Sequence, residues 1–540
     1  MNTTNFFANR QINAHTLIAI VALFLTLTAN YTFFEQVSKV YPPAEQWLFF
    51  GSLFLVLFGL LSLVMTIISN RFILKGILIF FLMVSSITSY FTDTYGTVYD
   101  TNMLQNALQT DQKESADLFN IIFVLRILLL GVLPSILVAK IKVNYPKGIK
   151  KIILNKALLI IASLAFVLLP ILANSKVYAS FFRVHKPLRY YTNPITPIYA
   201  VIKLGKIEYK QLTAPKELIM HATDATSIKT ADRKPRLMIF VVGETARADR
   251  VNLNGYQRTT FPQLTQLKNS NERFYNYQNV MACGTSTAYS VPCMFSYLGA
   301  DNYNVDMAVY QENALDTLDR LGVRLLWRDN NSDDKGVMNR LQTHYQNYRT
   351  SETNTICHSE YGECRDSGML VGLEQFINQQ KTDTLILLHQ MGNHGPAYYK
   401  RYDEKFNQFA PVCTDNELAK CEIQSLYNAY DNALLATDDF IYQSIELLKR
   451  HQQDYEVAML YVSDHGESLG EKGIYLHGMP NAFAPIEQKH IPAFLWLGQD
   501  VPFESNDEKI HLSHDAITPT LLKFFDVQTQ AIDGKTAFIK

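Results

Sequence analysis

Long apolar stretches occupy the first third of the chain. Five runs of mostly apolar residues occur before residue 175, at 14–34, 47–69, 72–91, 119–139 and 157–173. Each is about long enough to cross a ~30 Å hydrocarbon core as a helix that rises 1.5 Å per residue. No comparable run follows Asn174. The pattern predicts a five-helix transmembrane domain at 1–174, and the first run is too long to be a cleaved signal peptide.

Positive charge is distributed unevenly between the loops that join these runs, and loops rich in Lys and Arg stay in the cytoplasm. One side carries only Lys39 and Lys113. The other carries nine basic residues: Arg10, Arg71, Lys75, Lys140, Lys142, Lys147, Lys150, Lys151 and Lys156. We therefore expect a cytoplasmic N-terminus and a chain that is periplasmic after the fifth run. Arg126, inside the fourth run, either snorkels to the interface or lines a polar cavity.

The cysteines agree with this orientation. All six lie in the outer part of the chain, as the close pairs Cys283/Cys293, Cys357/Cys364 and Cys413/Cys421. Six cysteines allow fifteen connectivities, of which pairing by neighbours is the simplest. An even set in an oxidising compartment favours three local disulfides. Zinc binding by thiolates is disfavoured because no Cys-x-x-Cys occurs.

Residues 175–235 differ from the chain on either side. Aromatic and basic residues are mixed between 175 and 216, which is typical of an amphipathic segment at a membrane interface, with a plain linker as the alternative. Residues 221–235 are polar and predict a flexible boundary. We expect an interfacial connector and linker over the whole of 175–235.

From Arg236 onward, short apolar runs alternate with helical stretches. The runs lie at 236–244, 322–327, 383–389, 456–464 and 490–498, and helices are expected at 311–321 and 424–450. Short continuous apolar runs are typical of strands that are buried on both faces. The pattern predicts one α/β domain at 236–540, with a sheet covered by helices on both faces.

Side chains that can bind metal follow the points where these apolar runs stop. In open α/β sheets, ligands bind at the carboxyl ends of strands. Each residue alone has an ordinary explanation, a helix-start charge or a satisfied histidine, but the set has the chemistry of a zinc site with O and N ligands. It consists of Glu244, His389, His394, the adjacent Asp464 and His465, and His477.

Three consecutive hydroxyls, Thr285, Ser286 and Thr287, lie between Cys283 and Cys293 at the start of an expected helix. Helix N-termini favour anions such as phosphate. A hydroxyl bound to zinc is acidified and becomes a nucleophile. Capping of the helix by one of these hydroxyls is the alternative. The spacing leaves all three residues open as the nucleophile.

Long motifs resemble the lipid A phosphoethanolamine transferases of the mobile colistin-resistance type. The resemblance covers essentially the whole chain and includes "FVVGETARAD", "CGTSTAYSVPCMFSYLGAD", "LHQMGNHGPAY", "YVSDHGESLGE" and "YLHGMPNAFAP". It implies five transmembrane helices and a periplasmic domain of the alkaline phosphatase and sulfatase superfamily, with a mixed sheet. The Cys-x-Pro-x-Arg motif of sulfatases is absent, which disfavours a sulfatase.

The resemblance also implies residue roles. Thr287 would be the nucleophile that carries phosphoethanolamine. One tightly bound Zn²⁺ would be held by Glu244, Thr287, Asp464 and His465. His394 and His477 would contact phosphate or a second zinc and act as acid or base. The donor lipid would contact Asn106, Thr110, Glu114, Ser332 and Lys335.

The expected function is transfer of phosphoethanolamine from phosphatidylethanolamine to a lipid A phosphate. Diacylglycerol would be released, and the bacterium would gain polymyxin resistance. We expect a monomer in the inner membrane, and a net charge of −1 gives no sign of a nucleic-acid partner. The alternatives are another acceptor, such as a periplasmic glucan or heptose, a phosphodiesterase, and a membrane sensor with a non-catalytic outer domain.

Overall fold

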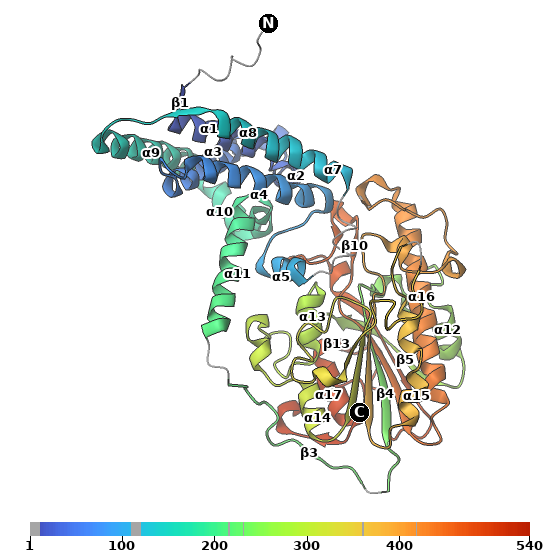
Figure 1. The fold of residues 1–540 in the computed structure, drawn as a ribbon. Helices are drawn as coiled ribbons and strands as arrows, with labels where there is room; N and C mark the ends of the chain where they lie inside the picture. The colour runs from blue at the N-terminus through green and yellow to red at the C-terminus, as the bar shows by residue number, and fades with distance from the viewer. Residues whose placement is uncertain (1–10, 110–119, 214–216, 231, 359–360, 417) are drawn as a thin grey trace. The chain divides into compact units, whose positions relative to one another are not determined.

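A computed structural model describes residues 11–109, 120–213, 217–230, 232–358, 361–416 and 418–540 (Figure 1). The chain forms two compact units. One comprises Met1–Thr101 and Phe119–Lys203, and the other comprises Asn102–Leu118 and Leu204–Lys540. The domain boundaries drawn from the sequence at 174 and 235 stay predictions.

The first unit is a helical bundle. Within the described ranges, four of its helices are long and apolar enough to cross a membrane: α3 (Pro43–Ile68), α4 (Leu74–Tyr95), the composite helix Ile121–Lys140, and α9 (Ile149–Ala173). A fifth span is formed if α1 (Ala14–Thr28) and α2 (Tyr31–Val40), which are bent by 58°, cross together.

The predicted run at 14–34 is therefore not one straight helix, and Asn30 accounts for the break. Its side-chain amide donates to the carbonyls of Leu25 and Asn193, both at 3.0 Å. An asparagine that bonds to nearby backbone competes with the helical hydrogen-bond ladder. The partner Asn193 lies 163 residues away, so local sequence gives no sign of this contact.

Small residues bring the bundle helices close together. A Cβ on Gly59 of α3 would lie 2.8 Å from the Cβ of Phe166 on α9. The composite helix consists of α7 (Ile121–Arg126), the π-helical segment η2 (Ile127–Val132) and α8 (Leu133–Lys140). Arg126 forms an ion pair with Asp93 of α4, so it has a charged partner inside the bundle. The close approach of α3 and α9 at Gly59 is typical of helix packing in membranes.

Two contacts place the basic loops at one end of the bundle. β1 (Gln11–Asn13), which precedes α1, pairs in parallel with β2 (Lys142–Asn144), between α8 and α9. Lys75, at the start of α4, donates from Nζ to the carbonyl of Ala139 at 2.7 Å. The loops that carry most of the positive charge thus share one end. The chain then continues through α10 (Ser175–Val184), η3 (Lys186–Tyr191) and α11 (Ile195–Thr213).

The second unit is built on an eight-stranded sheet in the order β13-β5-β12-β9-β4-β8-β6-β7. All five predicted strands are present, and β12 runs antiparallel to both its neighbours, which makes the sheet mixed. The strands are β4 (Arg236–Gly243), β5 (Arg273–Met281), β6 (Arg324–Asp329), β7 (Tyr345–Asn347), β8 (Thr384–His389), β9 (Glu456–Ser463), β12 (His490–Leu497) and β13 (His511–Ser513).

Helices cover both faces of this sheet (Figure 1). Alternate side chains of β4 enter two separate cores, with Met238 and Phe240 in one and Leu237 and Ile239 in the other. The first core also contains side chains of α13 (Thr287–Met294), α14 (Ala314–Arg320) and α17 (Ile517–Phe524). The second contains side chains of α12 (Pro262–Asn269), α15 (Leu373–Asn378) and α16 (Ile423–Lys449). The predicted α/β architecture is confirmed.

The polar segment 221–235 differs from the flexible boundary that its composition predicts. Within it, β3 (Thr226–Ser227) pairs with β14 (Val527–Gln528). The Asp224 carboxylate accepts hydrogen bonds from the Thr529 hydroxyl at 2.6 Å and the Gln530 N–H at 2.8 Å. These partners lie about 300 residues further along the chain, where local composition cannot reveal them. The cysteines form the three neighbour pairs, Cys283–Cys293, Cys357–Cys364 and Cys413–Cys421.

Candidate active site

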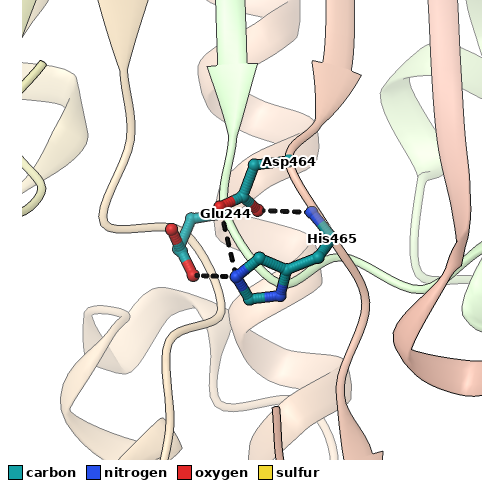
Figure 2. Close-up of side chains that lie close together, drawn as sticks. All are labelled: Glu244, Asp464 and His465. Atoms are coloured by element: carbon teal, nitrogen blue, oxygen red, sulfur yellow. Dashed lines mark hydrogen bonds and ion pairs between the residues drawn. The ribbon is translucent and has the colours of Figure 1, made fainter. Parts of the chain in front are cut away.

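Three side chains with metal-binding atoms meet at the carboxyl ends of two adjacent parallel strands. Glu244 follows β4, and Asp464 and His465 follow β9. One ligand atom of each residue lies within 4.8 Å of the others, and all three residues are buried. Figure 2 shows the two carboxylates and the imidazole converging on one point.

The hydrogen bonds of His465 fix its tautomer. Its Nδ1 lies 2.9 Å from the carbonyl oxygen of Gly466, which can only accept, so Nδ1 carries the proton. In the neutral ring, Nε2 then carries a lone pair directed at the space beside Asp464 Oδ2, 3.2 Å away, and Glu244 Oε1, 3.6 Å away, where a cation would separate these three acceptor atoms. Burial lowers the pKa of His465 to about 4. The ring is therefore neutral at pH 7 and ready to ligate a metal.

The two carboxylates need a positive charge between them. Asp464 Oδ1 accepts the N–H groups of Thr245 at 3.2 Å and His465 at 2.6 Å. Within the described part of the chain, Asp464 Oδ2 accepts no hydrogen bond. Two buried carboxylates at this separation repel each other unless a cation compensates them. Two carboxylates and one imidazole are a donor set that fits Zn²⁺.

Thr287 is the hydroxyl that lies at this cluster. It is the first residue of α13, and its Oγ lies 3.1 Å from Glu244 Oε2 and 3.4 Å from His465 Nε2. The hydroxyl of Thr285 donates instead to the carbonyl of Met479. Ser286 is the N-cap of α13, without a side-chain hydrogen bond to the helix. The geometry thus distinguishes three residues that their spacing leaves equivalent, and the one beside the cluster is Thr287, the residue that the family resemblance implies.

Asn331, which sequence reasoning missed, holds the Glu244 carboxylate. Its side-chain nitrogen donates to Glu244 Oε2 and to the carbonyl of Gln390, both at 2.7 Å, and the residue is fully buried. Asn331 follows β6, at the same edge of the sheet as Glu244. Its place just after an apolar run was the one signal in the sequence that could have identified it.

His514 is a second residue that the sequence did not identify. Its ring is fully buried and accepts the Cys283 N–H at Nδ1, at 3.1 Å, while Nε2 donates to the carbonyl of Ser463 at 2.9 Å. It therefore links the segment that carries Thr287 to the strand that precedes Asp464. Burial lowers the pKa of His514 to about 4, which keeps both hydrogen bonds in place at neutral pH.

Thr245 has a strained backbone beside the cluster. Its φ is 51°, in the left-handed region, which is unfavourable for a β-branched residue. The Asp464 carboxylate accepts its N–H, and the Tyr430 hydroxyl donates to its carbonyl at 2.6 Å. Strain of this kind persists only where surrounding contacts enforce it, which is typical of functional sites.

The remaining predicted histidines separate into two groups. The ring of His477 lies 4.4 Å from that of His465 and 5.2 Å from that of His394, measured between centroids. Burial, and then the neighbouring positive charges, holds the pKa of His394 well below its ordinary value. His389 instead pairs through Nδ1 with Asp329 Oδ2 at 2.8 Å. His394 and His477 thus lie beside the cluster, and His389 supports the strand end.

The predicted lipid-contacting residues are described in part. Ser332 donates from its hydroxyl to Asn331 Oδ1 at 2.8 Å, and Lys335 donates from Nζ to the carbonyl of Ser332 at 2.6 Å. Asn106 lies on α5 (Thr101–Gln109), but its side chain is outside the description, as are Thr110 and Glu114 altogether. The α5 helix runs beside the His477 loop, because a Cβ on Gly478 would lie 2.9 Å from the sulfur of Met103.

The mixed sheet covered by helices and the candidate metal cluster at its edge are typical of an α/β enzyme domain. Comparison with known proteins shows the family to which it belongs. Residues 236–527 match the Sulfatase family, and residues 57–209 match the family described as Phosphoethanolamine transferase EptA/EptB. The phosphatidylethanolamine transferase Mcr-1 of Escherichia coli is 60% identical over 100% of both chains. The chain therefore belongs to the phosphoethanolamine transferase family.

Solved structures agree with this assignment. The integral membrane protein lipooligosaccharide phosphoethanolamine transferase A of Neisseria meningitidis is 34% identical, with a TM-score of 0.89 over 97% of each chain. The C-terminal periplasmic domain of the phosphoethanolamine transferase EptC of Campylobacter jejuni is 40% identical, with a TM-score of 0.51 over 58% of this chain and 94% of that one. The fold likeness thus extends through the helical unit as well as the sheet domain.

Proposed function

We propose that the protein moves phosphoethanolamine from phosphatidylethanolamine to a phosphate of lipid A, through a phosphoethanolamine ester on Thr287. The observation that carries this proposal is the position of the Thr287 hydroxyl, 3.1 Å from Glu244 Oε2 and at the N-terminus of α13. The donor is supported by the name of the full-length relative that is 60% identical, a phosphatidylethanolamine transferase.

One Zn²⁺ would be held by Glu244, Thr287, Asp464 and His465. When bound, it supplies positive charge that acidifies a coordinated hydroxyl and offsets charge on the transferring group. The residues of the chain pre-arrange this site. Asn331 orients Glu244, the Gly466 carbonyl orients His465, and two backbone N–H groups orient Asp464.

In the first half-reaction, the Thr287 oxygen attacks the phosphorus of the donor lipid as its proton leaves toward Glu244. The bond between phosphorus and the diacylglycerol oxygen breaks, and that oxygen takes up a proton. In the second, an oxygen of a lipid A phosphate attacks the same phosphorus, the bond to Thr287 breaks, and Thr287 regains a proton. His394 and His477 would exchange these protons, which is supported by the His477 ring lying 4.4 Å from that of His465 and 5.2 Å from that of His394.

We place the sheet domain in the periplasm and the helical unit in the inner membrane. The positive charge of the loops at one end of the bundle supports this orientation, as do the three disulfides of the other unit. Alkaline-phosphatase fusions after Lys216 should be active, and fusions within 140–156 should be inactive. The reverse pattern would overturn the orientation.

The transfer itself is tested with purified full-length protein, phosphatidylethanolamine and lipid A in mixed micelles. Mass spectrometry should detect lipid A that is heavier by one phosphoethanolamine unit, with diacylglycerol formed in equal amount. Thr287→Ala should give no product, while Thr285→Ala, which loses a neighbouring hydroxyl bonded to Met479, should retain turnover. Diacylglycerol release without modified lipid A would instead support a phosphodiesterase.

A further inference from the structure

A pocket lies at the end of the helical unit where the basic loops gather. It has a volume of about 400 Å³ and is lined by residues of α1, α3, α4 and α9 and of the loops at that end. A pocket of this volume is large enough for a small-molecule group. Its lining combines apolar side chains, such as Ile18 and Ile152, with the basic side chains of His15, Arg71 and Lys156.

The lining favours an anion. Among the described residues that form it, three are basic and none is acidic. Lys156 donates from Nζ to the carbonyls of Ile67 at 3.1 Å and Ser69 at 3.0 Å, so its charge partly satisfies the C-terminal end of α3. Arg71 is exposed, with its guanidinium 4.5 Å from the centre of the Phe72 ring. Arg71 is therefore the cation in the lining that a ligand can reach.

His15 gives an independent indication of a ligand. Both nitrogens of its ring are buried, and neither has a hydrogen-bond partner within the described residues. A buried polar group without a partner is costly, and an occupant with acceptor oxygens would satisfy it. His15 is the second residue of α1, whose first turn contains no acidic residue, so the helix dipole also favours negative charge here.

Apolar surface adjoins this basic lining. Phe72, which lines the pocket, is 79% exposed, and its neighbour Ile73 is 47% exposed. An occupant must therefore combine an anionic group with hydrocarbon. We infer that the pocket binds an anionic glycerophospholipid of the phosphatidylglycerol type, with its phosphate at His15 and Arg71 and its acyl chains along Phe72 and Ile152.

This lipid is distinct from the proposed substrate. Phosphatidylethanolamine carries an ammonium group, and the described residues of the lining include no carboxylate to receive it. Anionic lipids are a recognised partner of basic pockets between membrane helices. In the proposed orientation the cytoplasmic leaflet would supply this lipid. The binding itself does not depend on the orientation. Because the lining residues come from several helices, a bound lipid would stabilise the bundle by mass action.

The test uses delipidated full-length protein in detergent, offered equal amounts of phosphatidylglycerol and of the zwitterionic phosphatidylcholine, which is not the proposed donor, and observed by native mass spectrometry. Phosphatidylglycerol should be retained in preference. Arg71→Ala should weaken its retention about fivefold, the factor expected for one basic residue near a charged lipid. Lys151→Ala removes the same charge from a nearby exposed position outside the pocket and should leave retention unchanged.

A second variant tests the shape of the pocket independently of its positive charge. Ala14→Trp fills space in the lining without removing a basic group, and it should also weaken phosphatidylglycerol retention. Equal retention of the two lipids would overturn the inference. Equal losses in Arg71→Ala and Lys151→Ala, with Ala14→Trp unaffected, would show a diffuse attraction and would overturn it as well. Neither result bears on the transfer reaction, because no step of the assay involves catalysis.

Discussion

The hydroxyl of Thr287 donates to Oε2 of Glu244 at 3.1 Å, across 43 residues of sequence. The contact joins the first residue of a helix to the residue that follows a central strand, β4. If Thr287 is the nucleophile and Glu244 a metal ligand, as we propose, this contact holds the reacting oxygen at a fixed place before substrate arrives, which is the geometric basis of proximity in catalysis. The proposed chemistry depends on the groups that hold these two side chains.

Removal of the Asn331 amide should weaken zinc binding. Asn331 donates to Glu244 Oε2, and the loss of such outer hydrogen bonds typically lowers metal affinity about 10- to 100-fold. We expect Asn331→Ala to reach that range in competition titrations with a zinc chelator. Asn279→Ala, which removes an amide bonded to the Lys509 carbonyl, is the control and should bind zinc as the parent does. Unchanged affinity in Asn331→Ala would show that Glu244 is held by other contacts.

Loss of the Cys283–Cys293 disulfide should lower the transfer rate more than loss of the Cys413–Cys421 disulfide, although the two losses should cost similar stability. It closes a loop over a sequence separation of 10, and Cys413–Cys421 closes one of 8. Loss of either bridge should lower the free energy of unfolding by about 2–3 kcal/mol in the chain-entropy model. Only the first bridge encloses Thr287. The double variant with Ser at Cys283 and Cys293 should therefore have a lower transfer rate than the double variant with Ser at Cys413 and Cys421. Equal rates in the two double variants would contradict this role.

Acid should lower the stability of the folded protein through protonation of His514. An unfolded histidine has a pKa near 6.5, while burial lowers the pKa of His514 in the folded state to about 4. The unfolded chain therefore takes up the proton first, so the stabilisation by His514 is complete above about pH 6.5 and declines as the pH falls toward 4. Melting temperatures should decrease over this window.

The contribution of His514 appears as a difference between variants, since other histidines also titrate. His514→Asn should melt lower at pH 7.5 and show a shallower decrease on acidification than the parent. His511→Asn changes an exposed histidine three residues away and should retain the slope of the parent. A slope in His514→Asn equal to that of the parent would refute the assignment.

Expression should raise resistance to polymyxins. Esterification of one lipid A phosphate with ethanolamine shifts the local charge by about two units toward positive, and cationic peptides bind that surface through charge. Glu244→Ala, Thr287→Ala and Asp464→Ala should each cancel the increase in inhibitory concentration, and the increase should shrink at higher salt. Resistance that persisted in Thr287→Ala cells with unmodified lipid A would point to a different protective route.

The sequence predicts the centre of the sheet and the metal residues for one physical reason. Strands buried on both faces must be continuously apolar, so β4, β8 and β9 are visible as uninterrupted runs. A polar residue directly after such a run lies at the ligand-binding edge of the sheet. Glu244 and Asp464 are predictable on this basis, and the structure brings them together with His465.

Other features depend on partners that are distant in sequence. The strand β5 alternates polar and apolar residues and lies nearer the sheet edge, so its pattern is weaker. Asn331 lies in a polar stretch that resembles any loop until β6 is placed beside β8. His514 acquires its role only when Cys283 and Ser463 approach it from two other segments. Spacing alone likewise could not choose among the three hydroxyls, and only the family resemblance indicated Thr287, which the structure places at the first position of α13.

The most direct test of the account is the site of the covalent intermediate. Full-length protein is incubated with phosphatidylethanolamine in the absence of lipid A, quenched in acid, digested, and mapped by tandem mass spectrometry. The proposed mechanism requires one phosphoethanolamine group on Thr287, which disappears when lipid A is added before the quench. A group on Thr285 or Ser286, or no adduct in a preparation that still modifies lipid A, would contradict it.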